Sequence, residues 1–233
     1  MIYPMLREPV RRAMLIGIGA LALVALLAEP ALAADAPRVE FKTSAGNFVI
    51  EVYPDKAPKT VENFLHYVGD GHYNGTIFHR VISNFMVQGG GFDRDYKQKK
   101  TRAPVAHEGR AALAAGGAKN VIGTVAMART ADPNSATSQF FVNVANNAFL
   151  DPVVIPPGDP VPRLEYQGRT YENTPRAKLE SAPQLYGYTV FGKVVSGMDV
   201  IEKIAAMPTG AGGPFPTDAP KTPVTIESAA VVN

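Results

Sequence analysis

The sequence contains no cysteine, which excludes both a disulfide and a lipid anchor attached through a cysteine. Cysteine is also a frequent zinc ligand, so zinc would have to rely on histidine and carboxylates. There are four histidines, at positions 66, 72, 79 and 107, and no two of them have the i, i+4 spacing of a helical zinc pair. The sequence therefore predicts no metal site and no cofactor.

A strong charge of one sign is also lacking. The chain has 23 basic and 21 acidic side chains, and its formal net charge is +2. The one basic cluster, residues 93–102, contains two aspartates and is typical of a solvated surface loop. Because nucleic-acid-binding proteins concentrate basic side chains on one surface, we expect no nucleic acid partner.

Common catalytic motifs are missing too. There is no Gly-x-Ser-x-Gly elbow, and the run Gly89–Gly91 lacks the spacing of a nucleotide-binding loop. No particular pair of carboxylates is indicated, although a hydrolase that uses an unrecognised pair stays open as an alternative. These absences favour a reaction without a nucleophile, a metal or proton abstraction.

The N-terminus has the three parts of a signal peptide. Arg7, Arg11 and Arg12 precede sixteen mostly apolar residues, 13–28, and a small-x-small site ends at Ala33. We predict a signal peptide over residues 1–33, cleaved after Ala33, and export to the periplasm. An uncleaved anchor is the alternative, although sixteen residues are fewer than the roughly 20 that span a bilayer. The arginine pair hints at twin-arginine export.

Removal of residues 1–33 leaves 200 residues (233 minus 33) with a net charge of +1, because three arginines and two glutamates are lost. This length suits one domain, residues 34–233, with a full core. Short runs with strand periodicity dominate it, and two segments have helical periodicity. The strand-like runs are 39–53 (a hairpin), 78–91, 120–128, 138–145, 188–195 and 223–232, and the helical segments are 57–71 and 197–207. The pattern predicts a mainly β protein, a closed or nearly closed antiparallel barrel capped by two α-helices.

Residues 151–187 do not fit this pattern. Seven prolines in this Pro-rich insert are incompatible with a central strand or a long helix through most of it, although residues 164–171 have the pattern of a short hairpin. Two interpretations stay open: a mobile neutral insertion, or an element of the site's rim that shapes the choice of client, because its ends adjoin Leu150 and Tyr188.

The stretch FHRVISNFMVQGGG, residues 78–91, suggests a specific chemistry. Arg80, Met86 and Gln88 share a parity, so a strand would place them on one face. Rotation about a peptide bond before proline needs no nucleophile or metal, but its barrier is about 18–20 kcal/mol. A catalyst needs an apolar slot for the proline ring and a donor to the prolyl nitrogen, and an arginine is a permanently charged donor.

Three motifs together resemble the cyclophilin family of peptidyl-prolyl cis-trans isomerases, particularly its exported bacterial members. They are FHRVISNFMVQGGGF, GTVAMARTADPNSATSQFFVNVANNAFLD and YTVFGKVVSGMDVIEKI. The resemblance runs from about residue 39 to about residue 232 and is interrupted by the insert, with a smaller extension at 111–117. It implies a closed eight-stranded antiparallel barrel capped by two helices, with a surface groove for an X-Pro segment.

The resemblance also implies roles for individual residues. Arg80 matches the catalytic arginine and acts with Gln88, and His79 beside it is structural. The other matched positions bind substrate: Phe85, Met86, Ala128, Gln139, Phe141, Phe149, Leu150 and Tyr188. Ala128 begins a matched strand edge that pairs with the substrate backbone, and Arg129 and Thr130 continue this edge. Phe149 stands where the best-known eukaryotic members of the family often have tryptophan, and Tyr188 stands where they often have histidine. Both keep an apolar wall, but the lost indole donor argues against tight cyclosporin binding.

The implied activity is isomerisation of X-Pro bonds in unfolded or folding exported proteins. We expect a monomer that has no cofactor or metal, binds no nucleic acid and has no stable membrane association after signal cleavage. The alternative from another class is a proline-binding module or chaperone that keeps the groove but does not depend on turnover.

Overall fold

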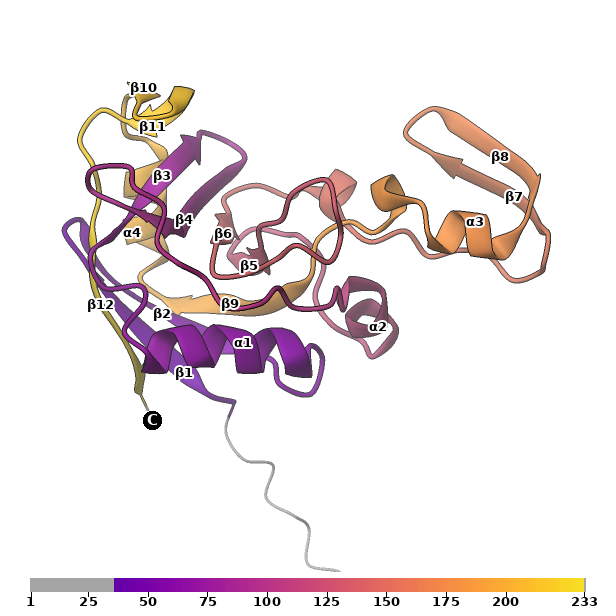
Figure 1. Cartoon of the computed structure of the whole chain (residues 1–233), viewed down its shortest axis with the longest axis horizontal. Coiled ribbons are helices and arrows are strands. Elements are labelled where there is room, and N and C mark those ends of the chain that lie inside the picture. The colour runs from indigo at the N-terminus through magenta and orange to yellow at the C-terminus, as the bar shows by residue number, and fades with distance from the viewer. Residues whose placement is uncertain (1–35, 233) are drawn as a thin grey trace, which may run out of the picture. The chain divides into compact units, whose positions relative to one another are not determined.

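The computed structural model describes residues 36–232, which belong to one compact unit (Figure 1). The predicted signal peptide and its cleavage site lie outside the described residues. Within the described part of the chain, no helix is long and apolar enough to cross a membrane.

One eight-stranded sheet, antiparallel throughout, forms most of the structure (Figure 1). In spatial order its strands are β12 (Ile226–Val232), β1 (Arg38–Thr43), β2 (Gly46–Val52), β9 (Val190–Ser196), β5 (Thr124–Met127), β6 (Phe140–Asn143), β4 (Met86–Asp93) and β3 (Thr76–Ile82). Each strand falls within a predicted strand-like run or overlaps one, but the run 78–91 contains parts of two strands, β3 and β4, joined by a turn at residues 83–85. The prediction of a mainly β protein is confirmed.

The sheet curls into a half-barrel, and the prediction of a closed barrel is wrong. Strands β12 and β3 are the two ends of the sheet, and one bridge, Ile77 to Thr225, links the segments that approach each other there. The amide of Phe78 donates to the carbonyl of Val224 at 3.0 Å.

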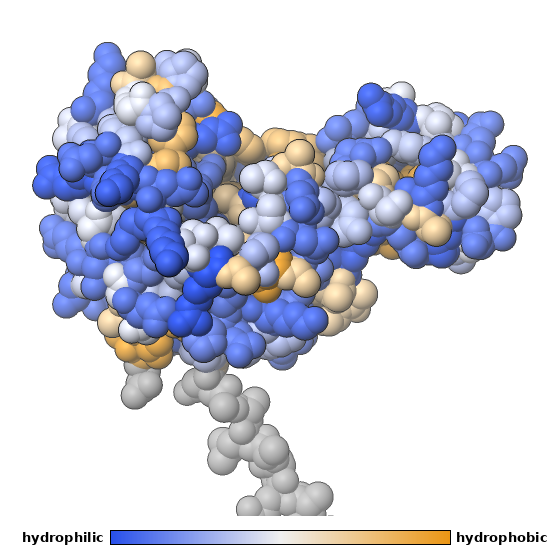
Figure 2. Space-filling model, viewed as in Figure 1, coloured by the Kyte–Doolittle hydropathy of each residue, from blue (hydrophilic) through white to orange (hydrophobic). Residues whose placement is uncertain are grey.

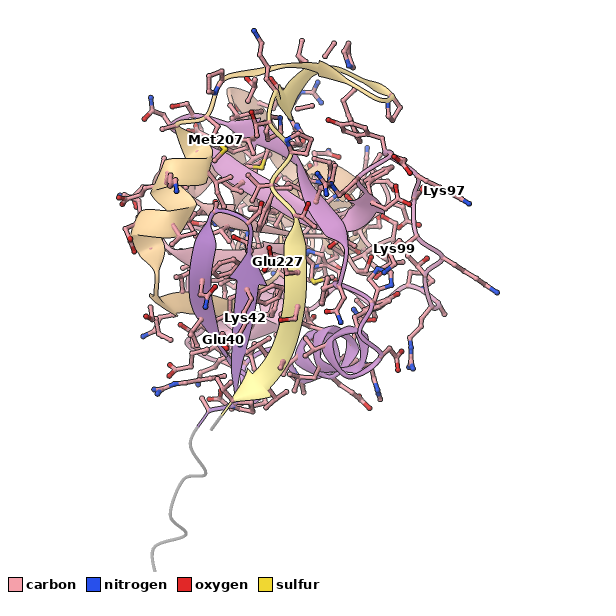
Figure 3. All side chains as sticks on the ribbon, turned by 90° about the vertical axis from the view of Figure 1, so that its left-hand side faces the viewer. Glu40, Lys42, Lys97, Lys99, Met207 and Glu227 are labelled. Atoms are coloured by element: carbon pink, nitrogen blue, oxygen red, sulfur yellow. The ribbon has the colours of Figure 1, made fainter. Side chains whose placement is uncertain are left out.

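The sheet separates an aromatic core from a polar outer face, as period-2 alternation requires. Along β1, Val39 and Phe41 are fully buried, whereas Lys42 is exposed. Figure 3 shows the outer side of β12, β1 and β2, where Glu40, Lys42 and Glu227 are labelled. The core contains a cluster of aromatic rings in mutual contact: Phe41, Phe48, Phe64, Tyr73, Phe78, Phe140 and Phe191.

Both predicted helices are confirmed. Helix α1 (Pro58–Gly69) begins with a proline, whose missing N–H has no helical partner at that position, and α4 (Met198–Ala205) buries Ile201 and Ile204. The short α2 (Gly109–Ala114) and α3 (Arg176–Glu180) were not predicted, nor were the 3₁₀ turns η1 (Ala148–Leu150) and η2 (Pro183–Leu185).

The Pro-rich insert is a folded element. Its predicted hairpin is confirmed as β7 (Val161–Tyr166) paired with β8 (Arg169–Thr174). A small apolar cluster of its own holds it together, made of Val161, Leu164, Leu179 and Leu185. Near its base, the amide of Val153 donates to Leu185 and the amide of Tyr188 donates to Leu150. The two ends of the insert are therefore fixed to each other.

A second hairpin was not predicted. Strands β10 (Thr209–Gly212) and β11 (Phe215–Pro220) pair with each other and pack on β3. The ring of Phe215 lies 5.1 Å from that of His79 and 5.1 Å from that of Phe92. The segment is rich in glycine and proline, which are typical of loops, so its sequence did not indicate strands.

We predict that Phe140→Ala lowers the free energy of unfolding by about 3–5 kcal/mol, because it leaves a cavity within the aromatic cluster. Guanidinium chloride unfolding measures the change. The exposed Val231→Ala is the control and is expected to change stability by less than about 0.5 kcal/mol. A loss below about 1 kcal/mol in the phenylalanine variant would contradict the central position assigned to this ring.

Candidate functional site: an apolar groove beside two arginines

Three neighbouring strands present their outward side chains in one row. Arg80 of β3 is paired with Gln88 of β4, and Gln88 is paired with Phe141 of β6. Ala126 of β5 follows opposite Phe141. Because side chains of directly paired residues lie on the same face of a sheet, this row brings an arginine, a glutamine and a phenylalanine side by side.

The row borders a groove with a cavity of about 130 Å³. Its lining contains eight of the ten predicted site residues and one further arginine: Arg80, Phe85, Met86, Gln88, Ala128, Arg129, Phe141, Leu150 and Tyr188. This volume is well below the roughly 300–1,000 Å³ of sites for drug-sized molecules. The groove therefore has room for about one side chain of a longer ligand.

The floor of the groove is apolar and preformed. Met86, Phe141 and Leu150 are buried in a cluster separate from the aromatic core. The ring of Tyr188 lies 5.5 Å from that of Phe141 in an edge-on arrangement, which is favourable for aromatic pairs. An apolar ring that enters this space would be removed from water without a large rearrangement of the floor.

Gln139 and Phe149 do not line the cavity. The Oε1 atom of Gln139 accepts a hydrogen bond of 3.0 Å from Nε2 of Gln88, so Gln139 orients the groove glutamine. A Cβ at Gly91 would lie 2.5 Å from Cγ of Gln139, which explains why a glycine stands there. Phe149 is 54% exposed and stacks on Phe85 at 5.6 Å, beside the groove.

Arg80 is accessible and has an acidic neighbour. Its side chain is 43% exposed, and its Nε atom lies 3.8 Å from Oδ2 of Asp218 in β11. Sequence reasoning did not identify Asp218, since 138 positions separate it from Arg80 and its hairpin carries no strand signal. The contact leaves the guanidinium available to a ligand in the groove.

Arg129 is the second arginine of the groove. Its Nε and Nη2 atoms donate to the carbonyl of Gly187 at 3.0 and 2.9 Å, and Nη1 donates to Thr130. The guanidinium lies 4.7 Å from the ring of Tyr188. The sequence analysis placed Arg129 only at the edge of the matched strand. Both charged residues in the lining are arginines, so the groove is positively charged.

The histidines near the site are not suited to proton transfer at neutral pH. Burial lowers the pKa of His79 to about 4, and its ring lies between those of Phe92 and Phe215 at 4.7 and 5.1 Å. Burial also lowers the pKa of His107 to about 4. Among the described residues there is no group of three or more His, Cys, Asp or Glu side chains that could hold a metal ion.

The half-barrel sheet carries a small apolar groove that is bordered by two arginines. A family model described as cyclophilin type peptidyl-prolyl cis-trans isomerase/CLD matches residues 38–231. The chain belongs to this family.

Curated relatives and solved structures agree with this assignment. A peptidyl-prolyl cis-trans isomerase of Acinetobacter baylyi is 47% identical over 190 residues, 82% of each chain. The peptidyl-prolyl cis-trans isomerase B of Escherichia coli is 45% identical over 193 residues, 83% of this chain and 98% of that protein. A crystal structure of a cyclophilin-type isomerase of Cryptosporidium parvum has a TM-score of 0.55 at 20% identity, covers 85% of this chain and 98% of that one, and supports the fold.

The lowered pKa of His79 predicts a pH dependence of stability. The unfolded chain binds a proton at this histidine below about pH 6.5, whereas the folded protein does so only below about pH 4. The contribution of neutral His79 to the free energy of unfolding is therefore fully present above pH 6.5. It falls as the pH drops from 6.5 to 4, and its total is about 3 kcal/mol.

Denaturant unfolding at pH 7 and at pH 4 measures this loss. Between pH 7 and pH 4 we expect the free energy of unfolding to change less in His79→Phe than in the unchanged protein. The reason is that the variant lacks the buried titrating group. Parallel losses in the two proteins would show that His79 does not titrate in this way.

Proposed function

We propose that this chain catalyses cis-trans isomerisation of X-Pro peptide bonds at the groove. The observation that carries the proposal is an accessible arginine, Arg80, next to an oriented glutamine, Gln88, at the border of a preformed apolar slot. Membership of the family and the names of the curated relatives support the same activity.

The slot and the arginine meet the two requirements of the reaction. The proline ring enters the space bordered by Met86, Phe141 and Leu150, which fixes one side of the bond. As the amide twists, the prolyl nitrogen regains its lone pair and becomes an acceptor. Arg80 donates to this nitrogen, and because the interaction is strongest in the twisted state, it lowers the barrier of about 18–20 kcal/mol.

The polar neighbours hold the substrate backbone and the arginine. Gln88 binds the substrate backbone or orients Arg80, and Gln139 fixes the amide of Gln88. Ala128 follows the end of β5, its amide donates to the carbonyl of Gln139, and its carbonyl is the group that it offers to an extended substrate. Phe85 and Tyr188 form walls of the slot, and Phe149 extends the wall on the side of Phe85.

The natural substrates of this proposal are X-Pro segments of unfolded or folding exported proteins. The signal-like N-terminus supports a periplasmic location after cleavage at Ala33, with a mature domain of residues 34–233. N-terminal sequencing of the exported protein tests this point, and we expect the sequence to begin at Ala34. The proposed enzyme is a monomer that needs no cofactor or metal, binds no nucleic acid and has no stable membrane association.

We predict that Arg80→Ala slows catalysed exchange of a short Ala-Pro peptide at least about tenfold, equivalent to about 1.4 kcal/mol, because the donor to the prolyl nitrogen is lost. Exchange NMR on residues 34–233 measures the rate. The matched control is Arg102→Ala, which removes another half-exposed arginine paired with an acid, Asp70, outside the groove. The control is expected to keep the full rate.

Three outcomes would contradict the proposal. If the peptide binds but exchanges at the uncatalysed rate, the chain is a proline-binding module or chaperone. If full activity survives the loss of Arg80, the donor role is wrong. Hydrolysis of the peptide, in place of isomerisation, would favour the carboxylate-dependent alternative.

A further inference from the structure

A second cavity lies at the base of the Pro-rich insert. It has a volume of about 480 Å³ and is bordered by α2, by the chain that follows Leu150, by α3 and by Tyr186. Pro152, Val154 and Leu113 contribute apolar surface, and Val154 is 78% exposed. Figure 2 shows hydrophobic surface between the part that carries β10 and β11 and the part that carries β7 and β8.

This cavity is adjacent to the proposed isomerase groove along two chain segments. Leu150 lines the groove and Pro152 lines the cavity, and on the returning segment Tyr188 lines the groove and Tyr186 lines the cavity. On each segment the two sites are two residues apart, which corresponds to at most about 7 Å of extended chain. A bound polypeptide therefore needs only a few residues to reach from the groove into the cavity.

The junction between the two sites is rigid. The carbonyl of Gly187 accepts hydrogen bonds from Arg129 and lies 3.2 Å from Nε2 of His107. Gly187 has a φ of +63°, and a Cβ there would lie 2.4 Å from the amide nitrogen of Pro152. Because the groove arginine holds the end of the insert, the two sites keep a fixed relation to each other.

The cavity carries an incompletely compensated positive charge. Nη1 of Arg110 donates to the carbonyl of Glu180, and the guanidinium lies 4.5 Å from the ring of Tyr186. Its Nε and Nη2 atoms are buried and have no hydrogen-bond acceptor in the described part of the chain. The carboxylate of Glu180 is 3.4 Å from Arg176. Two arginines therefore face one carboxylate, and a further anion would be stabilised.

We propose that this cavity binds the flank of the same polypeptide whose proline occupies the groove, and that it selects an apolar side chain next to a carboxylate. The proposal rests on the proposed isomerase function and adds a substrate class to it. Adjacency to the groove favours a client flank over a second copy of this chain. The apolar lining takes the side chain, and the charge of Arg110 and Arg176 attracts the carboxylate.

The test compares two peptides on the 34–233 protein. The short peptide contains Ala-Pro with one residue on each side and reaches only the groove. The long peptide has the same centre and carries Leu-Glu pairs about four residues away on both sides, a distance that spans the junction. Exchange NMR gives the catalysed rate for each peptide, and titration gives each Kd. We expect the long peptide to bind at least about tenfold more tightly.

Val154→Glu tests the cavity without disturbing the core, because Val154 is largely exposed. The new carboxylate competes for the arginines and repels the acidic flank. We expect it to weaken the long peptide about fivefold or more and to leave the rate and the Kd of the short peptide unchanged. Val231→Glu, at an exposed valine outside the cavity, is the matched control and is expected to leave both peptides unchanged.

A peptide with Gln in place of Glu tests the charge independently of folding. With the unchanged protein, we expect this Gln peptide to lose most of the affinity that the long peptide gains over the short one. We also expect Arg110→Met to leave the Kd of the Gln peptide unchanged.

The outcomes separate this inference from the proposed function. Catalysed exchange of the short peptide, with equal Kd values for both peptides in all variants, would overturn the inference and leave the isomerase intact. No exchange of the short peptide would overturn the proposed function itself. A concentration-dependent dimer that Val154→Glu abolishes would assign the cavity to a second copy and also overturn the inference.

Discussion

The antiparallel register of β3, β4 and β6 is the constraint on which both the core and the groove depend. The same three strands direct Phe78 and Phe140 into the aromatic cluster and Arg80, Gln88 and Phe141 to the opposite face. On β3, a register shift between Phe78 and Arg80 turns these two residues of equal parity to opposite faces. Because the side chains of a strand alternate, a slip of one residue would exchange these two faces and destroy both at once. Hydrophobic burial in the core therefore fixes the position of the polar groups outside it. The groove needs little additional stabilisation of its own, and its geometry is as rigid as the sheet.

This rigidity matters because the proposed reaction depends on one hydrogen bond to a nitrogen that becomes an acceptor only in the twisted state. A donor that had to be ordered during the reaction would contribute less, so a preorganised donor is favoured. Several contacts hold the polar border in place: Gln139 orients Gln88, Gly91 leaves room for Gln139, and Asp218 lies beside Arg80. Arg129, which also lines the groove, donates to the carbonyl of Gly187 at the end of the insert. The insert, a folded element with its own apolar cluster, is thereby connected to the groove.

Much of this arrangement could be predicted from the sequence, where the signal was local. Alternation around residues 44–47 indicated the first hairpin, and helical spacing indicated α1 and α4. Equal parity grouped Arg80 with Gln88 as members of one strand, whereas the structure pairs them across two strands, β3 and β4. The features that were missed depend on contacts between distant segments. No local sequence pattern predicts that Asp218 approaches Arg80 or that Arg129 donates hydrogen bonds to Gly187. The glycines and prolines of the hairpin β10–β11 are typical of loops, so they did not indicate its strands. The open end of the sheet depends on the approach of two distant segments, which one bridge, Ile77 to Thr225, joins.

The central claim, that Arg80 acts on the substrate during rotation, can be observed at its own side chain. The Nε–H resonance of Arg80 in ¹⁵N-labelled protein should be followed while a saturating Ala-Pro peptide is isomerised. The account predicts exchange broadening of this resonance, with a rate constant equal to that of the peptide's cis-trans exchange, because the hydrogen bond forms and breaks with each rotation. An Arg80 resonance that stays sharp and unshifted while the peptide exchanges at the catalysed rate would contradict the account.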